Sequence, residues 1–227
     1  MSYDKSKVSI LIASKNEGEG IGKILKSVRK YSDDIIVIDA HSNDGTKEIA
    51  QKENVRFFLD NKRGRGDAIK IGIEKAKGEV LVLFDADGSH EEKDIPRFVE
   101  PILAKKADLV IGSRRTGGSF DVNVSFTGIV RSAGCDFLVS LVNKKYKTKL
   151  TDLLYSFRAI RRSTAKAIKI KSNDFGIEQE MVVSCLKKKY KVLEIPSREK
   201  ARGWGSSKLH TLTGIKFIFS LIQQLYI

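Results

Sequence analysis

The segment "VLVLFDADGSH", residues 80–90, is an apolar run that ends on two aspartates one residue apart, Asp85 and Asp87. An ionised carboxylate is costly to remove from water, and neighbouring carboxylates repel each other, so a buried strand that ends on such a pair usually presents it to a cation. The segment therefore predicts a buried strand whose tip carries a metal site formed by Asp85 and Asp87.

Outward from this strand, apolar runs alternate with amphipathic runs in both directions. The apolar runs that predict strands are residues 8–14, 34–40, 55–59, 80–85 and 107–113. The amphipathic runs that predict helices are residues 20–31, 44–53, 66–77 and 92–106. Strands and helices that take turns in this way form a parallel sheet with helices on both faces, so an α/β fold is expected.

The composition favours one large domain. The chain has 227 residues, of which 41% are hydrophobic, enough to bury a sizeable core. Cys135 and Cys185 have neither metal-type nor disulfide-type spacing, which fits a reducing, cytosolic setting. No signal peptide opens the chain and no apolar run reaches the roughly 18 residues of a membrane span, so we expect a protein that is neither secreted nor membrane-spanning.

Positive charge is concentrated in the last third of the chain. The formal net charge is +14, and from Arg158 onward 15 Lys or Arg stand against 5 Asp or Glu. An anionic partner is therefore expected at this end. Nucleic acid is not the expected partner, because no recognised binding motif occurs and the predicted strand tips are acidic.

Polar side chains follow four of the predicted strands. Ligands of open parallel sheets bind beyond the carboxyl ends of the strands, so these residues are expected to share one site. They are Ser14, Lys15, Asn16, Glu17, Asp39, Asp85, Asp87, Ser113, Arg114 and Arg115. Asp39 taken alone is equally compatible with a purely structural role. The glycine-rich stretch 62–72 lacks the lysine-hydroxyl ending of a P-loop and supports a nucleotide motif only weakly.

Several segments occur in the order seen in a known family. The chain from about Val8 to Leu209 resembles the family 2 glycosyltransferases, and especially the dolichyl- or polyprenyl-phosphate mannose and glucose synthases. The resemblance rests on "VSILIASKNEGEGIG", "IVIDAHSNDGTKEIA", "RGRGDAIKIGIEKAKGEVLVLFDADGSH", "LVIGSRR", "SFRAIRR" and "IPSREKARGWGSSKL".

The resemblance implies a GT-A fold: a Rossmann-like, mostly parallel sheet with helices on both faces and a C-terminal helical elaboration. It also implies a nucleotide-sugar donor and Mg²⁺ or Mn²⁺ held by Asp85 and Asp87. The residues it assigns to donor binding are Ser14, Asn16, Glu17, Asp39, Gly66, Asp67, Asp85, Ala86 and Asp87. The chain departs from the family pattern at Ala13, Lys15 and Ala40, which leaves the nucleotide open between GDP and UDP. It also has Ser89 where mannose synthases often have Gln, which leaves a third metal contact open.

The acceptor implied by the resemblance is a polyprenyl phosphate. A phosphate is already anionic and needs cations that orient it, not a general base. The residues expected to act in transfer are Asp87, Arg114, Arg131, Arg202 and Lys208. Asp152, Glu178 and Glu180 are expected to orient arginines or to serve as a base, unless the two glutamates only favour a helix N-terminus. Glycines and serines around Trp204 predict a loop that closes over the bound donor.

The last residues of the chain, 209–227, are expected to form a helix outside the catalytic domain. We expect a catalytic domain over residues 1–208 and an amphipathic helix over 209–227. This helix could pack on the core, lie on lipid or begin a membrane segment, and the preceding basic region favours the membrane surface. The side chains expected to enter lipid are Phe217, Phe219, Leu221 and Leu225.

Together these observations predict an inverting, metal-dependent hexosyltransferase. It would move a sugar from GDP-mannose or UDP-glucose to a polyprenyl (dolichyl) phosphate, while peripherally bound to the cytoplasmic face of a membrane. The alternative is a soluble family 2 enzyme with a hydroxyl acceptor, which would need a carboxylate base beside the anomeric carbon.

Overall fold

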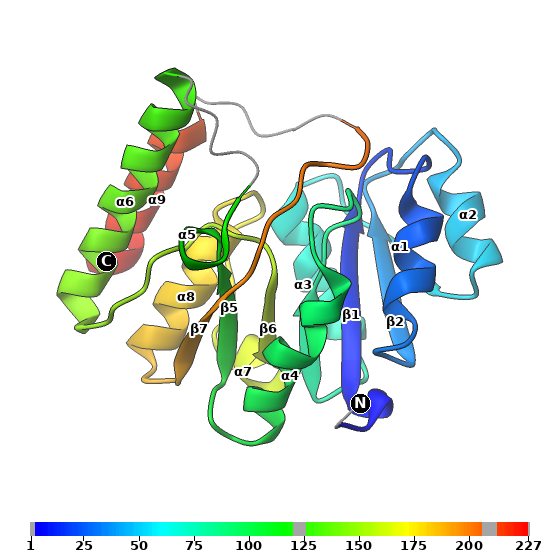
Figure 1. The fold of residues 1–227 in the computed structure, drawn as a ribbon, viewed down its shortest axis with the longest axis horizontal. Helices are drawn as coiled ribbons and strands as arrows, with labels where there is room; N and C mark the ends of the chain where they lie inside the picture. Colours follow the sequence, from blue (N-terminus) through cyan, green and yellow to red (C-terminus); the bar gives the residue numbers. More distant parts are fainter. Residues whose placement is uncertain (1–2, 120–125, 206–212, 227) are drawn as a thin grey trace.

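A central sheet organises the protein in the computed structural model, which describes residues 3–119, 126–205 and 213–226. Within these residues seven strands form one sheet in the order β3-β2-β1-β4-β6-β5-β7 (Figure 1). The strands are β1 (Val8–Ser14), β2 (Asp34–Asp39), β3 (Arg56–Leu59), β4 (Val80–Leu83), β5 (Leu109–Ser113), β6 (Arg158–Arg161) and β7 (Val192–Pro196). All pairings are parallel except those of β6, which is antiparallel to both β4 and β5.

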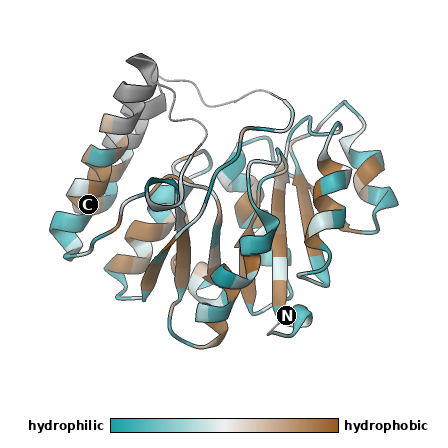
Figure 2. Ribbon diagram, viewed as in Figure 1, coloured by the Kyte–Doolittle hydropathy of each residue, from teal (hydrophilic) through white to brown (hydrophobic). Residues whose placement is uncertain are grey.

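Helices cover both faces of this sheet. They are α1 (Ile21–Val28), α2 (Thr46–Lys52), α3 (Arg65–Lys75), α4 (Ile95–Leu103), α5 (Arg114–Gly117), α6 (Phe126–Tyr146), α7 (Arg162–Ala167), α8 (Ile177–Lys187) and α9 (Thr213–Tyr226). Successive strand residues face opposite sides, so Ile36 and Ile38 pack with α3 while Ile35 and Val37 pack with α1 and α4. Two hydrophobic layers result, and Figure 2 shows the strands between them as mainly hydrophobic.

The predicted α/β fold is confirmed, with one departure in strand direction. The five strands and four helices expected from the sequence are present, with ends shifted by a few residues. The strands β6 and β7 were not expected. β6 is short and contains only two apolar residues, Ala159 and Ile160, so its sequence gives little strand signal. It lies between β4 and β5, and it carries Arg158 into the interior.

The C-terminal helix α9 packs beside α6 and against α8 at the end of the sheet that carries β7 (Figure 1). Leu221 and Leu225, which we expected to enter lipid, are only 0% and 2% exposed and join the main core. The expectation was wrong for these two because their face of the helix meets α6 and α8. Phe219 is 70% exposed. The side chain of Phe217 lies outside the described residues.

No helix in the described part of the chain is both long enough and apolar enough to cross a bilayer.

Candidate active site

The strands β1, β2, β4 and β5 all end at the same edge of the sheet, and the polar residues that follow them meet there. At the first two tips, Ser14 is paired in register with Asp39, and its Oγ donates to Asp39 Oδ1 over 2.8 Å. Ser42 donates two further hydrogen bonds to Asp39, from its backbone N–H to Oδ2 (2.7 Å) and from its Oγ to Oδ1 (2.6 Å). Asp39 therefore fixes the turn after β2.

The loop after β1 is tied to the loop after β2. The backbone N–H of Asn16 donates to Ser42 Oγ over 2.7 Å, and its side-chain oxygen accepts from the Asn43 N–H over 3.2 Å. The N–H of Glu17 donates to Thr46 Oγ1 over 3.1 Å, and the Glu17 side chain is buried. Asn16 and Glu17 thus join the loops that follow β1 and β2 at the carboxyl edge of the sheet.

The start of α3 is fixed from two sides. The carboxylate of Asp67 accepts from the backbone and side-chain amides of Asn61, at 2.8 and 3.2 Å. The N–H of Gly66 donates to the Asn173 carbonyl over 2.8 Å, and a Cβ on Gly66 would lie only 2.5 Å from the Ser172 carbonyl oxygen. Both expected residues therefore orient the loop before α3, and Gly66 is needed there for close packing.

Asp85 lies in a dense polar network at the tip of β4. Its Oδ1 accepts from Arg65 Nη2 over 2.6 Å, and its Oδ2 accepts from Ser156 Oγ over 2.5 Å. Arg65 also donates from Nε to Glu178 Oε1 over 2.9 Å, so one guanidinium joins β4 to the first turn of α8. Burial alone would raise the pKa of Asp85, but the charge of Arg65 outweighs it and holds this pKa below its usual range.

His90 supports the same network through hydrogen bonds to Asp85 and Ser156. It is buried, and its ring stacks on Phe157 with centroids 4.8 Å apart. The N–H of Asp85 donates to His90 Nδ1 over 3.2 Å, which places the proton of the neutral ring on Nε2, 3.1 Å from Ser156 Oγ. Burial lowers the pKa of His90. A chain of donors therefore runs from His90 through Ser156 to Asp85.

Asp87 has one oxygen fixed by its own turn and one that faces a cation. Oδ1 accepts from the N–H and the Oγ of Ser89, at 2.9 and 2.7 Å. Oδ2 lies 2.9 Å from Nη1 of Arg202, whose side chain is 40% exposed. Arg202 was expected beside the acceptor, and the structure pairs it with the second aspartate of the predicted metal site.

The segment 199–204 lies along the turn that carries the aspartates. Backbone bonds join Lys200 N to Ser89 O and Gly203 N to Asp87 O, both at 2.9 Å. The indole N–H of Trp204 donates to the Ala86 carbonyl over 3.1 Å. Trp204 also packs so closely on α1 that a Cβ on Gly20 would lie 1.9 Å from its Cε2. The segment already covers Asp87 in this structure.

Arg114 is held by Asp152 at the tip of β5. Its Nε and Nη2 donate to the two oxygens of Asp152 over 2.7 and 3.1 Å. Burial works against the charged forms, but the pairing outweighs it and lowers the pKa of Asp152. The expectation that acids orient arginines is confirmed for Asp152 with Arg114 and for Glu178 with Arg65, while Glu180 accepts from the N–H groups of residues 171 and 172.

Two expected acceptor residues cannot be placed against this geometry. The side chain of Arg131, in α6, and the whole of Lys208 lie outside the described residues.

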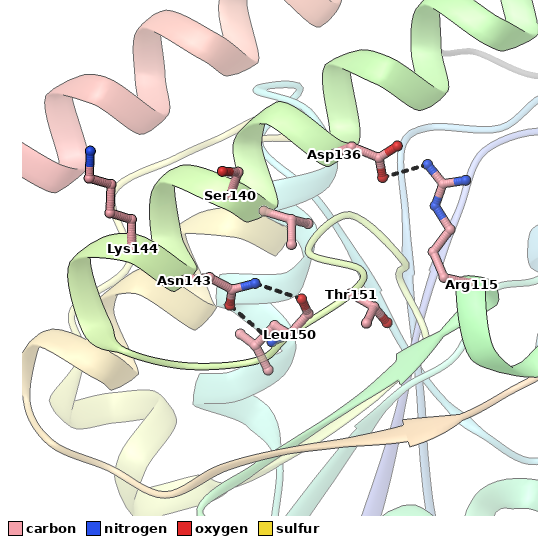
Figure 3. A pocket seen from close by; sticks show the side chains of 8 residues that line it. Arg115, Asp136, Ser140, Asn143, Lys144, Leu150 and Thr151 are labelled. Carbon is pink, nitrogen blue, oxygen red and sulfur yellow. Dashed lines mark hydrogen bonds and ion pairs between the residues drawn. The ribbon is translucent and has the colours of Figure 1, made fainter.

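A separate cavity of about 660 Å³ lies between α6 and the segment before β6 (Figure 3). The Arg115–Asp136 ion pair, at 2.7 Å, closes one side of it, and Asn143 on α6 binds the backbone of Leu150. Arg115 therefore pairs with α6 and lines this cavity.

The donor set at Asp87 fits a divalent cation that shares its coordination with a phosphate ligand. Among the described residues no three His, Cys, Asp or Glu side chains form a metal cage. Mg²⁺ in nucleotide sites commonly uses one or two carboxylates together with phosphate oxygens and water. Asp87 Oδ2 suits that arrangement, because the guanidinium of Arg202 already occupies it as a stand-in cation. Asp85 is the less available of the two expected ligands, because both its oxygens have fixed partners.

Three residues of the site were missed by reasoning from the sequence: Arg65, His90 and Ser156. Arg65 lies inside the "RGRG" turn, in which the two glycines are the stronger sequence signal. His90 ends the opening stretch, and its only signal was its closeness to the two aspartates. Ser156 is distant in sequence from its partner Asp85, so only the antiparallel placement of β6 brings them together.

Comparison with solved structures identifies the fold class. Crystal structures of glucosyl-3-phosphoglycerate synthase from Mycobacterium tuberculosis share the fold. The complex with Mn²⁺, UDP and glucosyl-3-phosphoglycerate has a TM-score of 0.74 at 16% identity and covers 98% of this chain and 81% of that one. The complex with Mg²⁺ and UDP has a TM-score of 0.77 at 18% identity, with coverage of 98% and 80%. The fold is of the GT-A type found in glycosyltransferases.

Sequence comparison then identifies the family. The profile of glycosyl transferase family 2 matches residues 9–169, and the chain belongs to that family. An uncharacterised protein of Methanocaldococcus jannaschii is 31% identical over 97% of this chain and 93% of its own length. The glycosyltransferase AglJ of Haloferax volcanii and the dolichol-phosphate mannosyltransferase of Pyrococcus furiosus are each 29% identical, over 88% and 97% of this chain. The chain spans only 65% and 63% of those two relatives.

Proposed function

We propose that the protein is an inverting, metal-dependent hexosyltransferase that moves a sugar from GDP-mannose or UDP-glucose to a polyprenyl (dolichyl) phosphate. The observation that carries the proposal is the carboxylate of Asp87, which faces a cation at the carboxyl edge of a GT-A sheet. The similarity to a dolichol-phosphate mannosyltransferase supports the choice of acceptor.

The donor would lie across the tips of β1, β2 and β4. Asn16 and Glu17 border this region from one side, and Asp67 fixes the loop on the other. Asp87 would hold Mg²⁺ or Mn²⁺, and Asp85 would add negative charge beside it. When bound, the cation would neutralise the diphosphate as it leaves.

The acceptor phosphate would be held by arginines. Arg114 is fixed in place by Asp152, and its guanidinium also lies 3.7 Å from Glu199. Arg202 lies on the 199–204 segment, where it pairs with Asp87. In the transfer step a phosphate oxygen forms a bond to the anomeric carbon. The bond from that carbon to the donor diphosphate breaks, and the electron pair leaves with the nucleoside diphosphate. The attacking oxygen carries no proton, so no general base is needed.

The surface around α6 and α9 suits a peripheral position on the cytoplasmic face of a membrane. Phe137 on α6 is 50% exposed, and Phe219 and Ile222 on α9 are 70% and 41% exposed. The chain from Arg158 onward carries a net charge of +10. Exposed aromatic and aliphatic side chains together with basic charge favour adsorption to anionic lipid.

The test is a transfer assay with radiolabelled GDP-mannose and UDP-glucose, Mg²⁺ or Mn²⁺, and a short-chain polyprenyl phosphate. We expect label in the organic phase with one of the two donors, and NMR of the product should show inversion at the anomeric carbon. The Asp87→Asn variant should form no labelled lipid product. Transfer to 3-phosphoglycerate or to a sugar hydroxyl, with none to the lipid phosphate, would overturn the proposed acceptor.

A further inference from the structure

The carboxylate of Asp87 is paired with the guanidinium of Arg202 through one of its two oxygens. Nη1 of Arg202 lies 2.9 Å from Asp87 Oδ2. The other oxygen is taken by Ser89. A divalent cation on Asp87 would therefore use the oxygen that Arg202 now contacts.

We propose that Arg202 is a resident counter-ion of Asp87 that a divalent cation displaces, and that this displacement releases Arg202 to the acceptor phosphate. The inference rests on the proposed function, since it takes Asp87 as the metal ligand. It gives Arg202 two successive partners, a carboxylate before metal binding and a phosphate after it.

The geometry makes this exchange possible without rearranging the core. The Asp87 side chain is nearly buried, whereas that of Arg202 is 40% exposed, so the arginine is the partner able to move. A half-exposed ion pair contributes little to stability, so a metal bound to carboxylate and diphosphate oxygens can replace it. Asp85 is unsuited to such an exchange, because its partner Arg65 is held on the far side by Glu178.

Movement of Arg202 is coupled to a larger unit. The neighbouring Gly203 N–H donates to the Asp87 carbonyl, and the Trp204 indole donates to the Ala86 carbonyl. Trp204 is half-buried between Gly20 and Gly88. Displacement of the Arg202 guanidinium is therefore expected to disturb the neighbouring contacts of Gly203 and Trp204.

As a consequence, metal and nucleoside diphosphate should bind before the acceptor phosphate. Before metal binds, the positive charge of Arg202 is satisfied by Asp87, and an acceptor phosphate would have to compete with that carboxylate. After metal and nucleoside diphosphate bind, Arg202 has lost its partner and presents its guanidinium to an anion. The acceptor phosphate then binds more tightly than it does to the free protein.

Trp204 is the only tryptophan in the chain, so its fluorescence reports directly on this segment. The experiment titrates the purified protein with MnCl₂, alone and with UDP or GDP, and follows free Mn²⁺ by EPR and Trp204 emission in parallel. It compares the wild type with Arg202→Ala, Arg202→Lys and Asp87→Asn, and it uses Arg198→Ala as a matched control at an exposed arginine of the same stretch.

We expect Mn²⁺ to change Trp204 emission in the wild type and the Arg198→Ala control. We expect Arg202→Ala to bind Mn²⁺ about three-fold more tightly, the factor for loss of a half-exposed competing pair. Arg202→Lys keeps a cation and should retain wild-type affinity. Unchanged or weaker Mn²⁺ binding by Arg202→Ala, while Asp87→Asn loses it, would overturn the exchange and leave the proposed metal site standing. Undiminished Mn²⁺ binding by Asp87→Asn would overturn the metal site itself.

The order of binding is tested by calorimetry with farnesyl phosphate, a soluble lipid phosphate. Wild-type protein should bind it at least about five-fold more tightly with Mn²⁺ and nucleoside diphosphate present, and Arg202→Ala should lose that gain. Equal affinity with and without Mn²⁺ in the wild type would contradict the release of Arg202.

Discussion

Arg65 donates to Asp85 over 2.6 Å across the edge of the sheet, and the same guanidinium binds Glu178. Replacing Arg65 with Met leaves two nearly buried acids without their cation. We expect the unfolding free energy to fall by about 3–5 kcal/mol, the cost of breaking a buried ion pair. Urea denaturation measures this, and the double variant Arg65→Met/Glu178→Gln should lose less than the sum of the single variants. A loss within about 0.5 kcal/mol for Arg65→Met would place it with ordinary surface substitutions.

The two aspartates of the strand tip should respond differently to the same change. Asp85→Asn weakens the pairing with Arg65 and should destabilise the protein by about 1–3 kcal/mol, because a buried charged partner is left less satisfied. Asp87→Asn loses only a half-exposed pair and should cost less than about 1 kcal/mol, yet it should abolish Mn²⁺ binding. Denaturation and EPR on the same preparations check both halves. Equal destabilisation by the two variants would show that the partners of Asp85 stabilise the protein no more than those of Asp87 do.

Stability below neutral pH should depend on Asp34, far from the strand tips. Burial would raise the pKa of Asp34, but hydrogen bonds from Ser9, Arg56 and the Lys77 N–H outweigh it and lower this pKa. A lowered folded-state pKa stabilises the protein above the unfolded value, about 3.9, and this contribution is lost as the pH falls through the folded value.

The Asp34 prediction is checked by measuring unfolding free energy from pH 3 to pH 7. We expect the wild type to exceed Asp34→Asn at pH 7 and the difference to shrink below about pH 4. A difference that stays constant over this range would show that Asp34 does not contribute through its ionisation.

The contact between Gly20 and Trp204 gives a steric prediction. A methyl group on Gly20 would lie 1.9 Å from Trp204 Cε2, so Gly20→Ala must displace the indole. We expect a red shift of tryptophan emission and faster acrylamide quenching, because the ring moves into water. Gly134→Ala is the control, since a Cβ there meets nothing within 4 Å. Emission identical to the wild type in Gly20→Ala would mean that Trp204 is not held against α1.

The exposed face of α9 should determine lipid binding separately from folding. Phe219→Ser/Ile222→Ser changes side chains that are exposed, and it should reduce sedimentation with anionic liposomes while leaving thermal unfolding unchanged. Leu221→Ala is the counterpart on the buried face and should cost about 2–5 kcal/mol of stability. Wild-type sedimentation should fall at high salt without vanishing. Liposome binding by the double variant equal to that of the wild type would remove this face as the membrane contact.

The sequence alone predicts five of the seven strands of the sheet and the edge at which the polar residues gather. Hydrophobic runs followed by amphipathic runs specify parallel strands with helices on both faces, and those runs are local features of the chain. The runs also bring Ser14, Asp39, Asp85 and Arg114 to one edge, because parallel strands end together. The order of the motifs along the chain also indicates the family, which the family profile confirms.

Which side chains become partners depends on the packing of segments that are distant in sequence. Asp85 meets Ser156 because β6 enters antiparallel beside β4, and Asp87 meets Arg202 because the 199–204 segment returns across the turn. The sequence pattern treated Asp85 and Asp87 as equivalent ligands. Their difference arises from long-range packing, which fixes both oxygens of Asp85 and leaves one oxygen of Asp87 facing the partly exposed Arg202. Likewise, α9 is amphipathic by sequence, but its contacts with α6 and α8 decide that Leu221 is buried and Phe219 exposed, since burial depends on what the rest of the chain places against each face.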